Sequence, residues 1–121
     1  MDKLEHIFEL QHAFDSELAA RRGLDPSDKA EWLRREMVAL IVEASEVLDE
    51  ANYKWWKDAR PLDHARILDE LADILHFYVA ACLKMGFDAQ DIYQAYLAKN
   101  RENFNRQRGL AEKEGYRSGS V

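Results

Sequence analysis

The sequence predicts an all-α protein organised as one domain. Its 121 residues are enough to bury one hydrophobic core. Threonine is absent and β-branched residues are few, whereas Ala, Leu, Glu, Lys and Arg, which favour helix, are abundant. Glycine, proline and aspartate divide the chain into four helical stretches. We therefore expect a four-helix, bundle-like subunit that comprises residues 1–121.

The first two helices lie on either side of a turn-forming segment. An amphipathic stretch from about residue 3 to residue 21 is ended by the segment Gly23-Leu-Asp-Pro-Ser. Ser27 or Asp28 can then cap a second helix, which runs to about residue 52. Apolar residues recur along this second helix at helical spacing, with a band of glutamates at the edge of the apolar stripe.

The third and fourth helices are delimited in the same way. Asp63, or the turn at Pro61, starts a third helix that stops at Gly86. Asp88 caps a fourth helix that continues to about Arg108. Glycine and serine are frequent beyond that point, so we expect a flexible tail over about residues 110–121.

The charge and the N-terminal composition exclude several classes of protein. A net charge of −6 argues against a general nucleic-acid binder, because affinity for the phosphate backbone comes from massed Lys and Arg. The first residues show no signal-peptide pattern, and no apolar run reaches the length of a membrane span. Cys82 is the single cysteine, which is typical of a reducing compartment. We expect a cytoplasmic protein.

Two acidic pairs with the same spacing are the strongest indication of function. Glu43-x-x-Glu46 and Glu70-x-x-Asp73 each place two carboxylates on one face of a helix, because residues three apart are neighbours on its surface. Both pairs border strongly apolar runs that contain no Lys or Arg. Carboxylates withdrawn from water need a cation or hydrogen-bond donors. The sequence therefore predicts a site in which Glu43, Glu46, Glu70 and Asp73 bind a divalent metal.

Alternative explanations of these acids are weaker. A single Glu-x-x-Glu pair is common on solvated helices, but two pairs in the same apolar context favour a metal site. A di-iron bundle uses Glu-x-x-His pairs, and Asp73-x-x-His76 is the only near match. Ligation by oxygen alone favours Mg²⁺, with Mn²⁺ as a substitute.

Two segments carry the residues expected to bind phosphate. Lys54-Trp55-Trp56-Lys57 joins the two acidic helices. Lys99, Asn103 and Arg106 fall on neighbouring turns of the fourth helix. Cations, amides and aromatic rings together suit a nucleotide, although packing could account for one of the two tryptophans, and a polar solvated face for part of the fourth helix.

The third helix also predicts an oligomer. It is apolar on almost every side, and a helix of that kind is normally buried on most faces. Four helices of one small chain cannot cover so much apolar surface. We therefore expect a homodimer or homotetramer.

At this level of detail the sequence resembles the all-α nucleoside triphosphate pyrophosphohydrolases, which include the MazG-like proteins. Within them it is closest to the dimeric type of dUTP diphosphatase found in some bacteria, phages and kinetoplastids. The resemblance covers nearly the whole chain, although Leu110-Ala-Glu-Lys-Glu114 lengthens one spacing and the longer members have further helices. The matching motifs are Leu10-Gln11 with Phe14-Asp15, Glu43-x-x-Glu46, Tyr53-Lys54-x-Trp56, Glu70-x-x-Asp73 with Phe77, and Tyr96-x-x-Lys99-Asn100-x-x-Asn103-x-x-Arg106-Gln107 followed by Gly115-Tyr116.

The resemblance implies an enzyme that hydrolyses dUTP to dUMP and pyrophosphate. The four acids would bind two or three Mg²⁺ ions, and Glu43 or Glu46 would accept the proton of the attacking water. The other roles that it implies concern the nucleotide. Phosphate oxygens would be bound by Lys54, Lys99 and Arg106, the uracil by Gln11 and Trp56, and the sugar by Asn103 and Phe77.

Two alternatives remain open from the sequence. A MazG-type pyrophosphohydrolase for another or a damaged nucleotide would use the same four acids with a different base pocket. A non-catalytic helical interaction protein would keep the acids as remnants or as ion-pair partners.

Overall fold

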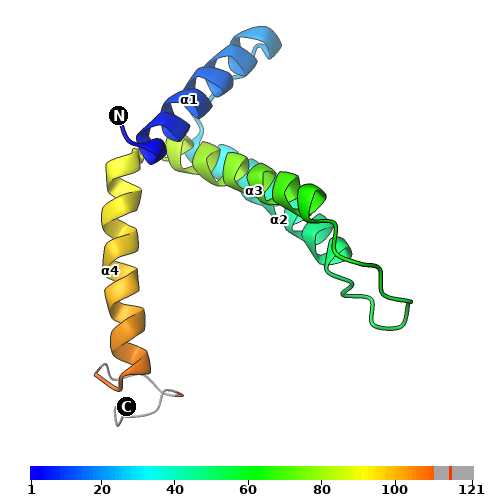
Figure 1. Cartoon of the computed structure of the whole chain (residues 1–121). Helices are drawn as coiled ribbons and strands as arrows, with labels where there is room; N and C mark the ends of the chain where they lie inside the picture. The colour runs from blue at the N-terminus through cyan, green and yellow to red at the C-terminus, as the bar shows by residue number, and fades with distance from the viewer. Residues whose placement is uncertain (111–114, 116–121) are drawn as a thin grey trace. The chain divides into compact units, whose positions relative to one another are not determined.

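The computed structural model confirms the all-α fold class. It describes residues 1–110 and Gly115, and these contain four α-helices and no strand (Figure 1). The helices are α1 (Lys3–Arg22), α2 (Lys29–Glu50), α3 (His64–Lys84) and α4 (Ala89–Gln107). Most of the predicted tail at 110–121 lies outside the described residues. No helix among the described residues is long and apolar enough to cross a membrane.

Every helix begins at an aspartate cap. Asp2, Asp28, Asp63 and Asp88 precede the four helices, and the carboxylate of each accepts a hydrogen bond from the backbone N–H three residues later. This bond satisfies one of the N–H groups that a helix start leaves without an intrahelical partner, and the negative charge suits the positive end of the helix dipole. The caps explain why the predicted helix starts agree closely with the observed ones.

Each predicted helix end lies within two residues of the observed one, and the second and third helices show the largest difference. We expected the second helix to run to about residue 52, but α2 ends at Glu50. Asn52 adopts the left-handed conformation with φ of 58°, which no helix interior accepts. Asparagine tolerates this conformation better than most residues, and here it starts the loop that connects α2 with α3.

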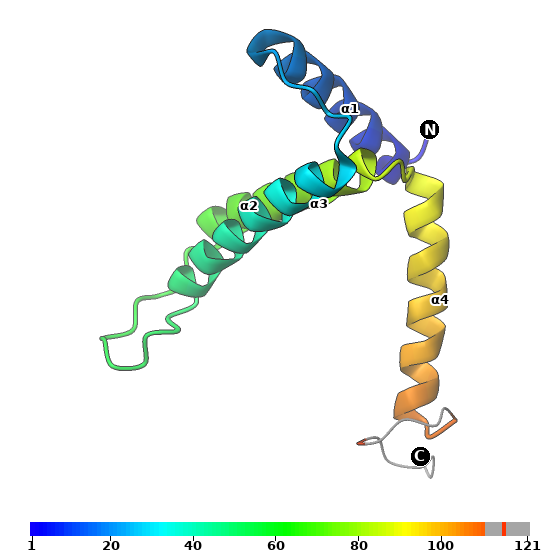
Figure 2. The same ribbon diagram turned by 180° about the vertical axis from the view of Figure 1, so that it is seen from behind.

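The chain divides into two compact units, Met1–Phe87 and the part from Asp88 onward. In the first unit, α2 and α3 run side by side in opposite directions, as the two views in Figures 1 and 2 agree. Helix α1 contacts α3. The second unit contains α4, whose start is stabilised by a capping box between Asp88 and Asp91.

A charged contact joins the three helices of the first unit. Lys84, the last residue of α3, has its Nζ atom 3.6 Å from Asp15 of α1 and 3.6 Å from Glu36 of α2. All three side chains are at least 85% buried, since 13%, 15% and 12% of their surface is exposed. The same Nζ atom lies 5.1 Å from the centre of the Trp32 ring. We call these four residues the Lys84 cluster.

The hydrophobic core of the first unit is small. Val79 is fully buried, and Phe8, Ala80, Ala81 and Cys82 are nearly so. In contrast, α2 has no buried residue. Large apolar side chains on α2 and α3 are exposed instead, among them Ile41 at 65%, Leu68 at 68% and Leu71 at 49%.

Candidate metal centre and nucleotide site

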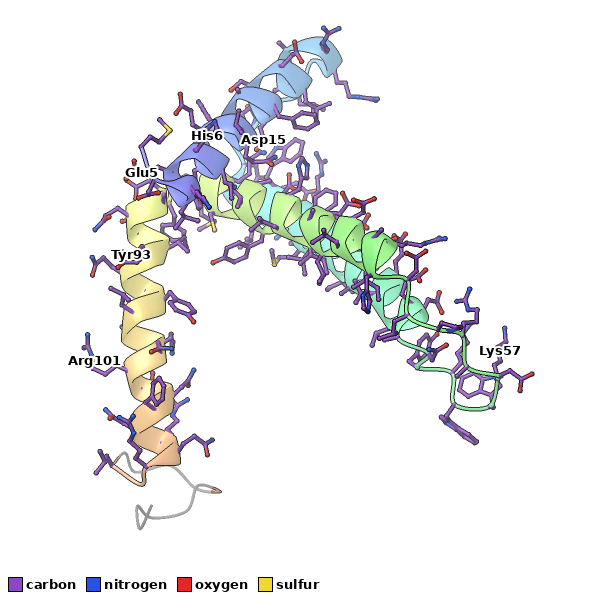
Figure 3. All side chains as sticks on the ribbon, viewed as in Figure 1. Glu5, His6, Asp15, Lys57, Tyr93 and Arg101 are labelled. Carbon is purple, nitrogen blue, oxygen red and sulfur yellow. The ribbon has the colours of Figure 1, made fainter. Side chains whose placement is uncertain are left out.

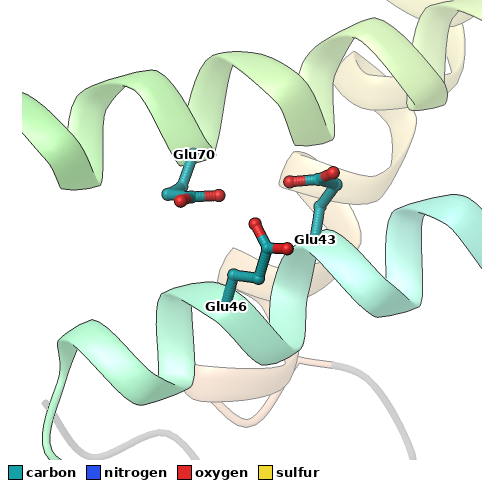
Figure 4. A group of neighbouring side chains, drawn as sticks. All are labelled: Glu43, Glu46 and Glu70. Atoms are coloured by element: carbon teal, nitrogen blue, oxygen red, sulfur yellow. The ribbon is translucent and has the colours of Figure 1, made fainter.

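Three of the four predicted ligands converge between α2 and α3. Glu43 and Glu46 point from α2, and Glu70 points from α3 into the same space (Figure 4). One carboxylate oxygen of each residue lies within 4.8 Å of one carboxylate oxygen of the other two. We call these three residues the acidic cluster.

Asp73 lies beside the acidic cluster but outside it. It is exposed, and its oxygens are not part of the group of converging atoms. Its negative charge nevertheless contributes to raising the pKa of Glu43, so the two carboxylates are close enough to interact. A ligand role for Asp73 therefore stays a prediction, as does that of the other three acids.

The surroundings of the acidic cluster disfavour the ionised form of its carboxyl groups. Hydrogen bonding to Glu46, together with desolvation, raises the pKa of Glu70 from its ordinary value of 4.5 to about 7. Desolvation and repulsion by Glu46 raise the pKa of Glu43. Among the described residues, no Lys or Arg forms a salt bridge with any member of the cluster. The ion-pair explanation of these acids therefore gains no support from the described part of the chain.

Two oxygen atoms of the acidic cluster are buried without a hydrogen-bond partner among the described residues, Glu43 Oε2 and Glu70 Oε2. A buried acceptor left unsatisfied costs free energy, and a cation placed between the helices would satisfy both. Hard carboxylate oxygens are the ligands that Mg²⁺ and Mn²⁺ prefer. The residues present therefore fit a divalent metal.

A pocket adjoins the Lys84 cluster. Its volume is about 290 Å³, with Leu18, Leu24 and Leu83 on the apolar side and Asp15, Glu36 and Lys84 on the charged side. Asp15 Oδ2 is buried and accepts no hydrogen bond from a described residue. Desolvation raises the pKa of Glu36, and the positive charge of Lys84 opposes this shift.

Gln11, the predicted reader of the base, is not among the residues that line this pocket, but it contacts Asp15, which is. It is buried, with 7% of its surface exposed, and its Nε2 atom donates a hydrogen bond to Asp15 Oδ1 at 2.9 Å. This bond fixes the orientation of the amide and leaves its oxygen as an acceptor. Figure 3 shows Asp15 on α1 near the place where α1 meets α3.

The remaining predicted residues of the first unit lie on the loop and on α3. Lys54 is half-buried in the loop and lies 3.9 Å from Asp49. Trp56 is 60% exposed and meets the ring of Trp55 edge-on at 5.7 Å. Phe77 is half-buried on α3, and its ring lies 4.9 Å from that of His76.

The three residues predicted on the fourth helix share one face of α4. Lys99 and Arg106 both contact Glu102, at 3.4 Å in the case of Lys99, and Asn103 is exposed. They belong to the second unit. Their expected contact with phosphate or sugar stays a prediction.

Sequence reasoning did not bring the residues of the Lys84 cluster together, although Asp15 belongs to one of the matching motifs. Glu36 was visible as one of a band of glutamates, and Lys84 as a cation at the end of the most apolar helix. Neither signal shows that the two meet, because the contact depends on how α1, α2 and α3 pack together.

Comparison with known proteins identifies the family of this chain. A family model described as dUTPase matches residues 3–85, which include the acidic cluster and the Lys84 cluster. The chain belongs to this dUTPase family. The match confirms the resemblance to the all-α nucleoside triphosphate pyrophosphohydrolases predicted from the sequence.

Two curated relatives come from phages. The dCTP pyrophosphatase of Enterobacteria phage T4 is 30% identical over 104 aligned residues, a match that covers 66% of this chain and 61% of the relative. The dCTP pyrophosphatase of Enterobacteria phage LZ5 is 38% identical over 58 residues, or 48% of this chain and 34% of the relative. The chain thus spans less than two thirds of the length of these relatives. No solved structure matches.

The raised pKa of Glu70 predicts how stability depends on pH without metal. The native protein keeps a proton that the unfolded chain releases above pH 4.5, so this stabilisation is complete below pH 4.5 and is lost as pH rises through about 7. In EDTA, the melting temperature should therefore fall as the pH rises from about 4.5 to about 7 and then level off. Glu70→Gln should flatten this dependence, whereas Glu9→Gln on the exposed face of α1 should not. An unchanged pH slope in Glu70→Gln would contradict a raised pKa at Glu70.

Proposed function

We propose that this protein is a nucleoside triphosphate pyrophosphohydrolase that depends on a divalent metal and converts dUTP to dUMP and pyrophosphate. The observation that carries the proposal is the convergence of Glu43, Glu46 and Glu70 within 4.8 Å, with two buried oxygens that lack a partner among the described residues. Membership of the dUTPase family supports both the chemistry and the choice of substrate.

The proposed chemistry assigns the acidic cluster to the phosphate chain. Glu43, Glu46 and Glu70, with Asp73 beside them, would hold Mg²⁺ or Mn²⁺. The metal supplies charge neutralisation of the triphosphate and a lower pKa for a bound water. A carboxylate of Glu43 or Glu46 then accepts the proton of the attacking water.

The pocket beside Gln11 lies at a suitable distance for the nucleoside. Glu36 in its wall precedes Glu43 by seven residues of α2, which is two helical turns or roughly 10 Å. A base in the pocket would therefore leave space for a sugar before the phosphates reach the acidic cluster. Phe77, which lies on α3 between Asp73 and Lys84, is placed along this path and is proposed to contact the sugar, together with Asn103. The resemblance also implies that Trp56 contacts the base, but Trp56 lies on the loop beyond Glu50, at the other end of the α2–α3 pair, so this contact is not part of the proposal for a base in the pocket. Lys54, Lys99 and Arg106 are proposed to contact the phosphates.

A dCTP-specific enzyme is the second candidate, and the two phage relatives favour it, since both are named dCTP pyrophosphatase. The geometry of Gln11 suits either base. Its free amide oxygen can accept from the N3–H group of uracil or from the amino group of cytosine. A MazG-type enzyme for another or a damaged nucleotide would show a different preference from both.

We also propose that the active form is a homodimer or larger homo-oligomer. Val38, Ile41 and Val42 on α2, with Leu68 and Leu71 on α3, are all between 49% and 68% exposed. A monomer would leave these apolar side chains in water, and surfaces of this kind normally mark protein–protein contacts.

Removal of single charges from the acidic site tests the chemistry. Glu46→Gln should reduce turnover by at least about 100-fold, because it removes a ligand charge without changing volume. Asp73→Asn should do the same if Asp73 completes the metal shell. Asp69→Asn, on an exposed position of the same helix, is the matched control and should retain activity. Pyrophosphate release at saturating Mg²⁺ is the measurement, and near wild-type rates in Glu46→Gln would refute the metal site.

Base preference is tested by pyrophosphate release from dUTP, dCTP, dTTP and the corresponding ribonucleotides. We expect dUTP to give the highest kcat/KM, and a higher value for dCTP would replace dUTP by the second candidate. Gln11→Ala should lower kcat/KM for the preferred nucleotide at least tenfold and reduce discrimination, because a buried amide left unsatisfied penalises the wrong base. Gln90→Ala, at an exposed position of α4, should leave both unchanged.

The oligomer prediction is tested by light scattering at micromolar concentration. The wild-type protein should have at least twice the mass of the 14.1 kDa chain. Ile41→Glu with Leu68→Glu should shift it toward the monomer, because both side chains are exposed in the single chain and a charge there costs free energy only in an apolar interface. Circular dichroism checks that the double variant remains helical. A wild-type monomer would contradict the proposal.

A further inference from the structure

Asp15 places a carboxylate in the wall of the pocket that the proposed function assigns to the base. Its side chain is largely buried, with 15% of its surface exposed. One oxygen, Oδ1, accepts a hydrogen bond from Gln11 Nε2 at 2.9 Å. The other oxygen, Oδ2, is buried and has no hydrogen-bond partner among the described residues. A buried acceptor without a partner costs free energy, so a ligand that brings an N–H group to Oδ2 would gain by it.

Lys84 does not supply this missing donor. Its Nζ atom lies 3.6 Å from Asp15 Oδ2 and 3.6 Å from Glu36 Oε1, and both distances are longer than a hydrogen bond. An ammonium group has three N–H donors, and this one is surrounded by two carboxylates and the ring of Trp32. The lysine therefore balances charge in the pocket wall, but the free oxygen of Asp15 still lacks a hydrogen bond.

The rest of the pocket wall offers few free donors in its buried part. Glu36 contributes a second carboxylate, which also accepts hydrogen bonds. The Nε1 atom of Trp32 already donates to a main-chain carbonyl oxygen at 2.7 Å. His12 and Ser16, which complete the polar lining, are exposed. A base that enters the pocket therefore meets chiefly hydrogen-bond acceptors at its buried end.

The two candidate pyrimidines differ in the group that they carry at position 4 of the ring. Uracil has a carbonyl oxygen there, which is an acceptor, whereas cytosine has an amino group with two N–H donors. An ionised carboxylate can only accept hydrogen bonds, so it attracts the amino group and repels the carbonyl oxygen. Gln11 cannot make this distinction by itself, because an amide has both donors and an acceptor. Asp15 is therefore the residue whose chemistry separates the two bases.

We propose that Asp15 is a specificity-determining residue that lets the base pocket accept cytosine, so that dCTP is a substrate of this protein beside dUTP. The inference rests on the proposed function, because it requires the base to occupy this pocket. The amino group of cytosine donates to Asp15 Oδ2 and so satisfies the buried oxygen. Gln11 contacts the neighbouring ring position, where it can hold either base.

Asp15→Asn tests this role without a change in side-chain volume. Gln11 Nε2 still needs an acceptor, so the amide oxygen of the new side chain should stay toward Gln11 and its N–H₂ group should replace Oδ2. That group can donate to the 4-carbonyl oxygen of uracil. The ratio of kcat/KM for dCTP to kcat/KM for dUTP should fall at least tenfold, while the value for dUTP is retained or raised.

The control for Asp15→Asn is Glu17→Gln, which removes the same charge from an exposed position of α1 and should leave the ratio unchanged. Retained activity with dUTP shows that Asp15→Asn is folded. An unchanged ratio in Asp15→Asn would overturn the proposal.

A measurement on the wild-type protein does not depend on whether the variant folds. A dCTP analogue with hydrogen in place of the 4-amino group keeps the ring and its N3 atom but brings no donor to Asp15. Wild type should hydrolyse this analogue with a kcat/KM at least tenfold below that for dCTP. Equal values for dCTP and the analogue would also refute the role of Asp15.

Binding of the monophosphates dCMP and dUMP, measured by titration calorimetry, separates this inference from the proposed function. If wild type hydrolyses dUTP but not dCTP, the role of Asp15 is wrong and the function stands. If wild type hydrolyses no triphosphate, yet the ratio of its affinities for dCMP and dUMP falls at least tenfold in Asp15→Asn, the function fails and the role of Asp15 stands. Absence of both hydrolysis and binding would refute both.

Discussion

The close approach of three carboxylates between α2 and α3 is the constraint on which the rest of the site depends. Glu43, Glu46 and Glu70 repel one another when ionised, and desolvation makes that charge more costly. The two helices are therefore held together against an unfavourable force. A bound cation would replace this repulsion by attraction, because the carboxylate oxygens of both helices would then be attracted to the same ion. The cluster thus couples the spacing of the helices to the binding of metal.

The two ends of the α2–α3 pair are fixed by different interactions. At the end near α1, Lys84 lies between Asp15 and Glu36, and the side chains of all three are largely withdrawn from water. At the loop end, the side chain of Asn52 forms hydrogen bonds with both the N–H and the carbonyl oxygen of Arg60. Breaking a buried charge contact leaves an uncompensated charge, which costs several kcal/mol, so the Lys84 cluster resists separation of the three helices. The acidic cluster lies between these two fixed ends.

The helices were predictable from the sequence because their signals are local. An aspartate cap binds an N–H three residues away, and an i, i+3 acidic pair lies on one face whatever packs against it. The contact between Lys84 and Glu36 depends instead on the register of two helices, which no local pattern specifies. Local pattern also does not show that Glu70 joins the acidic cluster while Asp73 stays outside it. Both residues lie on the same face of α3, and only the position of α2 decides which one converges with Glu43. The left-handed Asn52 was missed because asparagine is compatible with a helix end as well as with a turn.

The order of charges along α2 and α3 gives the site a direction. From the α1 end, the Lys84 cluster comes first, with one cation and two acids. The acidic cluster follows, and no described Lys or Arg forms a salt bridge with it. The loop between α2 and α3 comes last, where four cations and three acids line a pocket. An acidic protein would repel a triphosphate if its charge were evenly spread. Segregation along the helix pair would remove that difficulty, because the acids would face a metal and the loop cations would lie apart from them, where phosphates could approach. Phosphates placed at the α1 end of the helix pair would instead meet Asp15 and Glu36, where a single lysine already contacts two carboxylates. This order of charges follows from the sequence, which places an aromatic and basic loop between the two helices that carry the acidic pairs.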